Sequence, residues 1–559
     1  MLRMLRRSFA LPLFALILFT ILLVPPAGNF PLNDDWVYAI PVKTLLDGHG
    51  YEAHPYRAAY GLFQTYWGAA FCLLFGYSHT VLRISTLLLA AMAVWLTAKS
   101  SREIGASRNV ALFCGAVLLA NPLFMNLSYT FMTEVPYIAL MAASGYFYLR
   151  ALRRGRSMDI FLGSSFAVLA FSNRQYGVLA SVAFVLSLLV ANRHALIRPG
   201  AFRVASFAAP WLVLALTCAV LRTLPDNPMQ RIGLAGNISR AQQIGLAINA
   251  LYSIPLYVGL FLLPLATMHA TRMLRRPRRT GRGQWVRVFV CTGFYSLAMA
   301  LGALPLPHLL PNMLRDLYVG PHTLYDTYFA NRLWAPVSAG FGAWYAISFI
   351  AALSAGVMFA SWRGVRGPLL RNKQSQAGYA PRRAQYWFLY SWAALLLVSP
   401  LNPALTIYFD RYLLPAMVPL FILSAAGLRC ISRPVWTVAV GLVILFYGFS
   451  VASVQDYLAW NRARWDGIEL LRAKYGARDE QIDGGYEFNG MYTSAKYRQA
   501  HPDRAIDYSG ERPWWVMEEV YAVSLLPRDG YETIDTIKYR SWLRGDGAMY
   551  LLKKRQQSG

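Results

Sequence analysis

Three carboxylates lie at the ends of long apolar segments, where acidic side chains need a reason. Asp34 and Asp35 form an adjacent pair just past the first apolar segment, and Glu134 opens a later one. Acids near membrane depth are costly and usually functional. A carboxylate within about 3 Å of a hydroxyl can take up its proton as a general base. The pattern therefore predicts acid–base chemistry at one boundary between lipid and water, with Asp34 as the first candidate.

The composition indicates a polytopic α-helical membrane protein. The 559 residues are 56% hydrophobic and 14% charged, which a soluble domain of this size rarely is. Because one span needs roughly 20 mostly apolar residues, we predict about thirteen transmembrane helices. The predicted spans are 8–24, 80–98, 109–128, 133–149, 158–173, 175–191, 204–221, 245–268, 288–306, 337–361, 386–400, 411–428 and 435–453.

The distribution of basic residues predicts the orientation of these spans. The net charge is +27, but arginines and lysines gather in every second loop, most densely between Arg272 and Arg287. With a cytoplasmic N-terminus this is the positive-inside pattern. The charge therefore reflects topology and contact with anionic lipid, and we expect no nucleic-acid partner. All three acids then lie on the outer side.

Two parts of the chain differ in character. Residues 1–453 form the predicted membrane domain, and 454–559 form a polar tail. The tail contains a helical stretch at 457–475, and strand-like runs follow at 481–483, 520–526, 531–539 and 549–552. These patterns predict a small C-terminal α/β domain. An odd number of spans places it outside the cytoplasm.

Two outer loops are long and aromatic. Within the first, residues 25–79, the stretches 36–46 and 60–74 have the pattern of helices that lie in the membrane interface. The loop 307–336 is also rich in tyrosine, and we expect it to help cover a cavity. Aromatic residues are also enriched at any membrane interface, so an ordinary aromatic belt is an equally good reading of each residue.

A series of short motifs follows the acidic pair along the chain. Its members are Asp34, Asp35, Arg57, Tyr66, Trp67, Arg83, Glu134, Arg174 and 410–415 (Asp-Arg-Tyr-Leu-Leu-Pro). Their order resembles the GT-C superfamily of integral-membrane glycosyltransferases, and it is most similar to the bacterial branch related to protein O-mannosyltransferases and lipid A aminoarabinose transferases. The resemblance covers most of residues 1–430. Asp replaces the more common Glu at the second acid, and Arg replaces the more common Lys after a later span.

The resemblance implies a GT-C-like fold in the bacterial cytoplasmic membrane and a transfer reaction on its outer face. A sugar would move from a polyprenyl-phosphate carrier to a glycan, lipid or protein acceptor, with inversion if it is displaced from behind. Arginine suits the leaving phosphate because it donates charge-assisted, often bidentate hydrogen bonds. The expected catalytic residues are Asp34, Asp35 and Glu134, the phosphate-binding residues Arg57, Arg174 and Arg411, and the substrate-binding residues Tyr38, Tyr66, Trp67 and Tyr412.

Structural roles remain open for several of these residues. Asp35 could cap the helix that follows it, and Glu134 could stabilise the N-terminus of its own helix through the dipole. Arg411 could reach along its helix end toward water or pair with Asp410. Arg83 is expected to be mainly structural.

A metal ion is also left open by the sequence. Asp34, Asp35 and Glu134 offer the hard oxygen ligands that suit Mg²⁺ or Mn²⁺, and they would be the ligands if such an ion binds. The chain has no glycine-rich phosphate loop with its lysine, so we expect a lipid-linked rather than a nucleotide-linked donor.

Two other classes of function fit part of the pattern. A secondary transporter or lipid-carrier flippase would also have about a dozen helices, but such proteins commonly show repeats and charges near the bilayer midplane. Here the acids gather at one boundary. A scaffold for envelope assembly, with the tail as its interaction module, is the third reading.

Overall fold

The computed structural model describes most of the chain. The described residues are 10–191, 200–221, 239–275, 282–306, 308–310, 313–314, 341–371, 379–399, 408–428, 431–501, 515–543 and 545–555. The aromatic part of the predicted loop 307–336 lies outside them.

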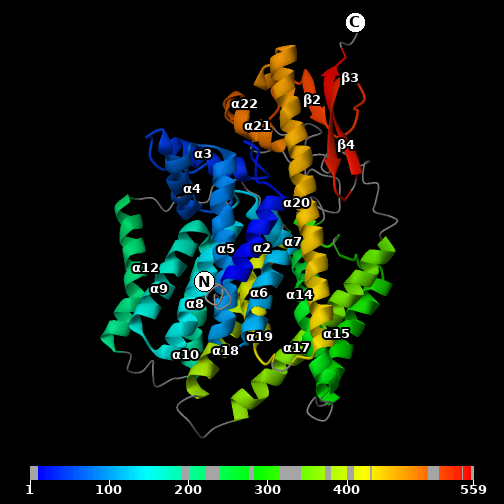
Figure 1. Ribbon diagram of the computed structural model, residues 1–559. Helices are drawn as coiled ribbons and strands as arrows, with labels where there is room; N and C mark the ends of the chain where they lie inside the picture. The colour runs from blue at the N-terminus through cyan, green and yellow to red at the C-terminus, as the bar shows by residue number, and fades with distance from the viewer. Residues whose placement is uncertain are drawn as a thin grey trace.

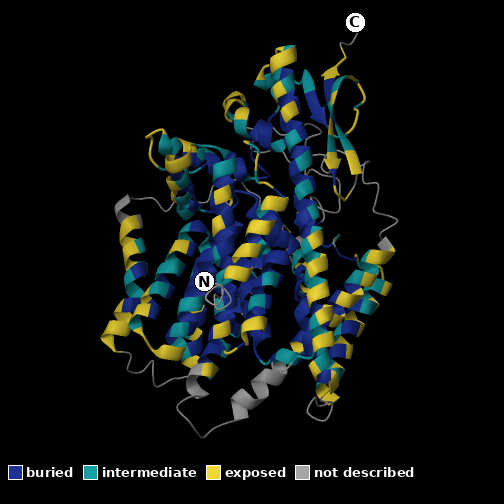
Figure 2. Ribbon diagram, viewed as in Figure 1, coloured by how far each residue is buried: buried dark blue, intermediate teal, exposed yellow. Residues whose placement is uncertain are grey.

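The larger part of the molecule is a bundle of helices (Figure 1), and every predicted span overlaps a helix of this bundle. Apolar side chains on these helices face one another and form a continuous core, while exposed residues follow their outer faces (Figure 2). The helices that contain the predicted spans are α2 (Leu11–Leu23), α5 (His79–Glu103), α6 (Arg108–Ala120), α7 (Pro122–Ser128), α8 (Glu134–Arg154), α9 (Ser157–Asn173), α10 (Val178–Ala191), α12 (Ala201–Leu221), α14 (Arg240–Arg275), α15 (Arg282–Ala300), α17 (Phe341–Arg371), α18 (Tyr379–Val398), α19 (Leu414–Ala425) and α20 (Arg433–Tyr475).

The predicted span 109–128 is a broken helix. Its two parts, α6 and α7, are bent by 69° at Asn121. A residue before proline avoids the helical conformation, and Pro122 begins α7. The Asn121 side chain accepts hydrogen bonds from the backbone N–H groups of Leu123 and Phe124, so it caps the second part.

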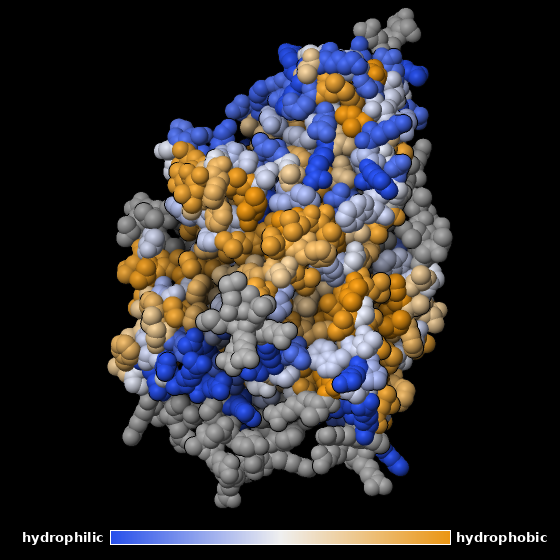
Figure 3. All heavy atoms as spheres, in the orientation of Figure 1, coloured by the Kyte–Doolittle hydropathy of each residue, from blue (hydrophilic) through white to orange (hydrophobic). Residues whose placement is uncertain are grey.

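Length and composition identify part of the predicted set as spans. Among the described residues, α5, α20, Ile244–Arg275 and Gly342–Trp362 are long and apolar enough to cross a membrane, and the pair α6–α7 makes a fifth if it counts as one span. Several other helices are apolar but shorter. On the face of the molecule drawn in Figure 3, hydrophobic residues form a belt across the bundle, with hydrophilic residues above and below it. The total of about thirteen spans therefore stays a prediction.

The predicted interfacial helices are present as α3 (Asp35–Leu46) and α4 (Leu62–Phe75). They lie side by side at one end of the bundle, beside the upper end of α5 (Figure 1). At the C-terminal end of α4, Leu73, Leu74 and Phe75 are more than two-thirds exposed. Such a row of exposed apolar side chains fits a helix that touches lipid.

The C-terminal part contains the predicted small sheet. Four strands, β1 (Ile482–Asp483), β2 (Tyr521–Ser524), β3 (Tyr531–Ser541) and β4 (Gly545–Lys554), lie in the order β1-β2-β4-β3. The β1–β2 pair is parallel and the other pairs are antiparallel. Two short helices, α21 (Tyr486–Tyr492) and α22 (Ser494–Ala500), follow β1.

One helix joins the bundle to this sheet. The predicted domain boundary at 453/454 falls inside α20, which continues without interruption to Tyr475 (Figure 1). Its second half keeps buried residues at helical spacing, among them Val454, Leu458 and Trp465. The C-terminal part is therefore attached through a continuous helix, and α21 packs directly on α3.

Candidate functional site

Asp34 stands at the start of α3, where the backbone turns sharply. Asn33 before it adopts a left-handed conformation, with φ of 54°, which asparagine tolerates better than most residues. The segment that leads into this turn is held by the buried Arg83. Its guanidinium donates to the carbonyl oxygens of Pro26, Gly28 and Phe30, at 2.7, 3.1 and 2.7 Å. Arg83 is thus structural, as expected.

The Asp34 side chain is 29% exposed and bound on both oxygens. Its Oδ2 lies 3.3 Å from Nη2 of Arg411, and its Oδ1 accepts a hydrogen bond of 2.9 Å from the hydroxyl of Tyr486. These contacts come from distant parts of the chain, since Arg411 precedes α19 and Tyr486 begins α21. Asp34 is therefore fixed in orientation yet still reachable from solvent.

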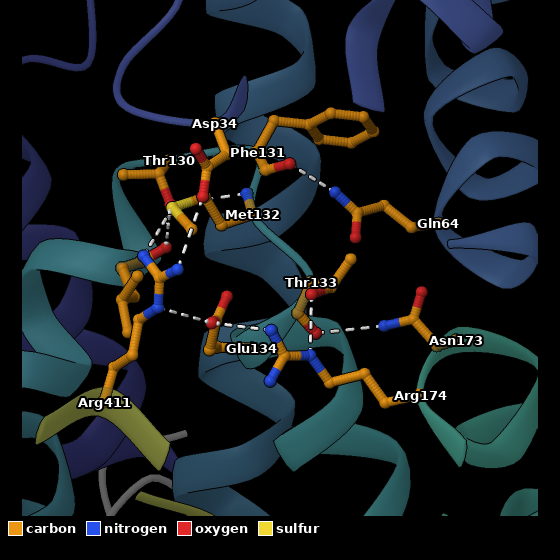
Figure 4. A network of polar contacts seen from close by, with 11 residues as sticks. Asp34, Gln64, Thr130, Phe131, Met132, Thr133, Glu134, Asn173, Arg174 and Arg411 are labelled. Atoms are coloured by element: carbon orange, nitrogen blue, oxygen red, sulfur yellow. Dashed lines mark hydrogen bonds and ion pairs between the residues drawn. The ribbon is translucent and has the colours of Figure 1, made fainter. Parts of the chain in front are cut away.

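Glu134 joins two arginines at the centre of the site (Figure 4). Its Oε1 lies 2.7 Å from Nη2 of Arg174 and 3.1 Å from Nε of Arg411. The Glu134 side chain is 1% exposed, and those of Arg174 and Arg411 are 14% and 6% exposed. Asp34, Arg411, Glu134 and Arg174 thus form a chain of alternating charge at the mouth of α8, which we call the charged chain.

The residues before α8 are held in place by side chains from two neighbouring elements. Thr133 accepts from Nε of Arg174 at 2.7 Å through its hydroxyl and from the Asn173 amide at 3.0 Å through its carbonyl. The amide of Gln64, on α4, donates to the carbonyl of Phe131. These bonds fix the approach to Glu134 and hence the direction of its carboxylate (Figure 4).

Asp35 points away from Asp34 and binds backbone. Its Oδ1 accepts from the N–H of Phe131 at 2.8 Å, and its Oδ2 from the N–H of Leu32 at 3.2 Å. The residue is 1% exposed, and burial raises the pKa of its carboxyl group to about 8 against the effect of both donors. Asp35 therefore ties the start of α3 to the segment before α8, a wider role than the helix cap considered from sequence.

Two predicted substrate-binding tyrosines line the charged chain. The guanidinium groups of Arg174 and Arg411 lie 5.8 and 5.9 Å from the ring centre of Tyr412, within the range of a cation–π contact. Tyr38 on α3 is buried and close enough to Arg174, Asp34 and Glu134 to interact with them electrostatically.

The other predicted residues lie around α4. The backbone N–H and the guanidinium of Arg57 both donate to the carbonyl of His54, at 3.1 and 3.5 Å. Tyr66 is 52% exposed and stacks on Tyr51. Trp67 donates through its indole to the carbonyl of Ser85. Their predicted roles in binding phosphate and substrate stay predictions that rest on the motif.

The three acids do not fit a shared metal ion in this arrangement. Asp35 turns both oxygens to backbone donors, and the Arg411 guanidinium stands between Asp34 and Glu134. Among the residues that the structure describes, no group of three His, Cys, Asp or Glu side chains is placed to hold one.

Several residues of the site were not predicted from the sequence. Tyr486 and Glu487 belong to the polar tail, which the sequence presents as a separate domain. Gln64 stands two residues before the Tyr-Trp pair, and Thr133 and Asn173 stand directly before Glu134 and Arg174. Adjacency to a motif residue was the only available signal for Thr133 and Asn173.

Comparisons with known proteins bear on the class. Residues 60–221 match the family model described as dolichyl-phosphate-mannose-protein mannosyltransferase. Crystal structures of ArnT from Cupriavidus metallidurans, bound to undecaprenyl phosphate and in the apo state, align with TM-scores of 0.41 at 14% identity. The alignments cover 98% and 97% of both chains, respectively. A comparison with curated proteins gives no match.

The family match spans Tyr66, Trp67, Glu134 and Arg174, which are four of the residues on which the resemblance rests. The match supports the predicted enzyme class, a glycosyltransferase.

Proposed function

We propose that this glycosyltransferase moves a sugar from a polyprenyl-phosphate donor to an acceptor of the cell envelope. The observation that carries the proposal is the charged chain itself. A partly exposed carboxylate, Asp34, lies next to two guanidinium groups that one buried carboxylate, Glu134, holds together. A sugar phosphate and a hydroxyl acceptor require such a base beside such cations.

Asp34 is the proposed general base. A carboxylate has about four acceptor positions on its two oxygens, and the contacts with Arg411 and Tyr486 use one on each oxygen. The exposed remainder can accept the proton of an incoming hydroxyl. Glu134 is nearly inaccessible and is engaged by two arginines, so its proposed role is to hold them.

Arg174 and Arg411 are the proposed binding groups for the donor phosphate. Their two positive charges balance the two negative charges of Asp34 and Glu134. An arriving phosphate adds negative charge beside guanidinium groups that are already oriented and largely shielded from water. Charge-assisted hydrogen bonds are strongest in such surroundings.

The proposed reaction follows from these placements. The acceptor oxygen attacks the anomeric carbon while Asp34 takes its proton. The bond between the anomeric carbon and the phosphate oxygen breaks, and its electron pair leaves with polyprenyl phosphate. Arg174 and Arg411 stabilise the charge that develops there. Attack from the side opposite the phosphate inverts the anomeric configuration.

The site is proposed to face the outer side of the bacterial cytoplasmic membrane. The helices α3 and α21 lie at the end of the bundle where the C-terminal sheet stands (Figure 1), and Tyr486 on α21 contacts Asp34 directly before α3. Glu134 begins α8 and the basic residues Arg153 and Arg154 end it, so they lie at opposite ends of that helix. The N-terminus is accordingly proposed to be cytoplasmic.

Release of the carrier tests the proposal directly. Purified protein in detergent would be incubated with a polyprenyl-phosphate sugar and envelope acceptors, and free polyprenyl phosphate would be measured. Asp34→Asn keeps the shape but cannot take a proton, so turnover should fall on the order of 10² to 10⁴. The matched control is Asp47→Asn, an exposed acid at the end of α3, which should leave turnover unchanged.

The same assay separates the transferase from a flippase. A flippase moves its carrier intact, so it would release no polyprenyl phosphate and would translocate the donor in sealed vesicles. Acceptor-independent translocation without release, or full turnover by folded Asp34→Asn protein, would reject the proposal.

A further inference from the structure

Helix α21, which follows strand β1, contacts the residue that begins the acidic pair. Its first residue, Tyr486, donates a hydrogen bond of 2.9 Å from its hydroxyl to Oδ1 of Asp34. The two residues are 452 positions apart in the chain. The contact therefore exists only when the C-terminal part is docked on α3.

The next residue secures the same docking by ionic bonds. Glu487 accepts the backbone N–H of Asn33 at 3.0 Å through Oε1. Its Oε2 lies 2.8 Å from Nη1 of Arg464 on α20, and both side chains are less than one-tenth exposed. Glu487 thus holds the left-handed residue that directly precedes Asp34, and Arg464 holds Glu487.

Aromatic packing sets the position of the Tyr486 ring. Its centre lies 5.9 Å from that of Trp36 and 5.7 Å from that of Trp515, and these two rings lie 5.5 Å apart. Trp36 is fully buried. The contacts of Trp36 with Tyr486 and with Trp515 are edge-to-face, at 70° and 75°, and the Tyr486 and Trp515 rings are tilted by 37°. Packing of this kind fixes ring orientation as well as position. The hydroxyl of Tyr486 is therefore aimed at Asp34 by a packed cluster rather than by a mobile surface loop.

We propose that Tyr486 is a positioning residue for the catalytic carboxylate and that the C-terminal part completes the active site. This inference rests on the proposed function of Asp34. Tyr486 holds Oδ1 and Arg411 holds Oδ2, so the plane of the carboxylate is fixed from two sides. Fixing that plane directs the remaining acceptor positions toward the incoming hydroxyl, and misplacement of a catalytic group lowers turnover more than binding.

Tyr486→Phe is the decisive variant because it removes one oxygen and keeps the ring packed against Trp36 and Trp515. With Arg174 and Arg411 intact, the KM for the donor should stay within about twofold. The kcat should fall by about tenfold, the lower end of what one hydrogen bond to a charged group provides. Both constants come from the release of polyprenyl phosphate, expressed per folded protein.

The control is Tyr492→Phe, at the other end of α21, where the ring packs against Phe488. The Tyr492 hydroxyl interacts with Arg472 and not with Asp34, so this variant should leave both kinetic constants unchanged. A purely structural role for Tyr486 predicts a lower unfolding temperature with an unchanged kcat per folded molecule, and that result would overturn the inference.

The outcome is separable from that of the proposed function. If wild-type protein releases carrier and Asp34→Asn does not, while Tyr486→Phe retains full kcat, the base assignment stands and the positioning role fails. If wild-type protein releases no carrier with any envelope acceptor, the proposed function fails first, and the positioning role falls with it.

Discussion

The Nε atom of Arg411 lies 3.1 Å from Oε1 of Glu134, and neither side chain is more than 6% exposed. Two charges removed from water in this way need each other, because the loss of one leaves the other buried and unpaired. Glu134 also binds Arg174, so it neutralises two guanidinium groups from different elements. The charged chain is therefore a feature of stability as well as of chemistry.

Glu134→Gln should be strongly destabilising. The amide keeps the shape of the side chain but leaves Arg174 and Arg411 without their shared negative charge. Breaking a buried pair costs about 3–5 kcal/mol, which denaturant or thermal unfolding in detergent would measure. Glu469→Gln is the control, because the Glu469 side chain in its ion pair with Arg472 is 65% exposed and such pairs contribute about 1 kcal/mol or less. Equal stability of the two variants would show that the buried pair is not coupled to folding.

Asp35→Asn should affect stability more than chemistry. An amide can accept one of the two backbone N–H bonds from Phe131 and Leu32, and its NH₂ group then faces the other donor. A loss of about 1–3 kcal/mol is expected for the unsatisfied group. Turnover per folded molecule should exceed that of Asp34→Asn, measured in the same carrier-release assay. If Asp35→Asn were instead the less active variant, Asp35 and not Asp34 would be the catalytic base.

The same residue should give the protein a pH-dependent stability. Burial raises the pKa of Asp35 to about 8 from 3.8, so the folded state holds this proton more tightly than the unfolded state. Its contribution is complete below about pH 4 and declines as the pH rises toward 8, with a slope of up to about 1.4 kcal/mol per pH unit. Asp35→Asn should flatten that slope in unfolding experiments across this range. Parallel curves for the two proteins would contradict the raised pKa.

Arg174 should recognise the donor phosphate by the geometry of its guanidinium. Arg174→Ala should weaken donor affinity roughly ten- to hundredfold, the value of one charge-assisted contact. Arg174→Lys should recover only part, because an ammonium keeps the charge but loses the fork that reaches Thr133 and Glu134 together. Donor binding would be followed by titration of purified protein. Arg156→Ala, an exposed arginine between α8 and α9, is the control, and an equal loss there would indicate nonspecific attraction.

Sequence reasoning located the helices well because apolar runs of sufficient length have few alternatives. It also selected Glu134, Arg174 and Arg411, since their charges stand at helix ends on one predicted side. It could not place them in contact. Residues 34 and 411 are 377 positions apart, and their ion pair depends on the packing of the whole bundle.

The C-terminal contribution was harder to foresee for a physical reason. Hydropathy falls near residue 453, which suggests a domain boundary, but hydropathy does not report where a helix ends. The amphipathic pattern continues through Leu458 and Trp465 and carries α20 onward to Tyr475. Tyr486 looks like an ordinary tail residue until that helix places it over α3.

The orientation can be tested by labelling of single cysteines. Lys538 on β3 and Arg156 are both exposed. Because Cys291 is partly exposed, the five native cysteines would first be replaced by serine. In intact cells, a membrane-impermeant maleimide should react with Lys538→Cys and spare Arg156→Cys until the cells are opened. This follows from the positive-inside pattern. Reaction of both positions from one side would refute the topology and the outer location of the site.

Gly490 should be essential for docking of the C-terminal part. A Cβ atom at this position would lie 2.4 Å from the Trp36 ring, closer than any real contact. Trp36 is fully buried, and its rigid ring has no room to move aside. We therefore expect Gly490→Ala to push α21 away from α3. Overpacking of this kind costs about 1–3 kcal/mol. Because the same shift pulls Tyr486 and Glu487 from the acidic pair, turnover should fall together with stability.

Gly441→Ala on α20 is the matched control, since nothing lies within 4 Å of its added Cβ. Carrier release and thermal unfolding of both variants check the prediction, and full activity of Gly490→Ala would show that the site does not need the docked α21.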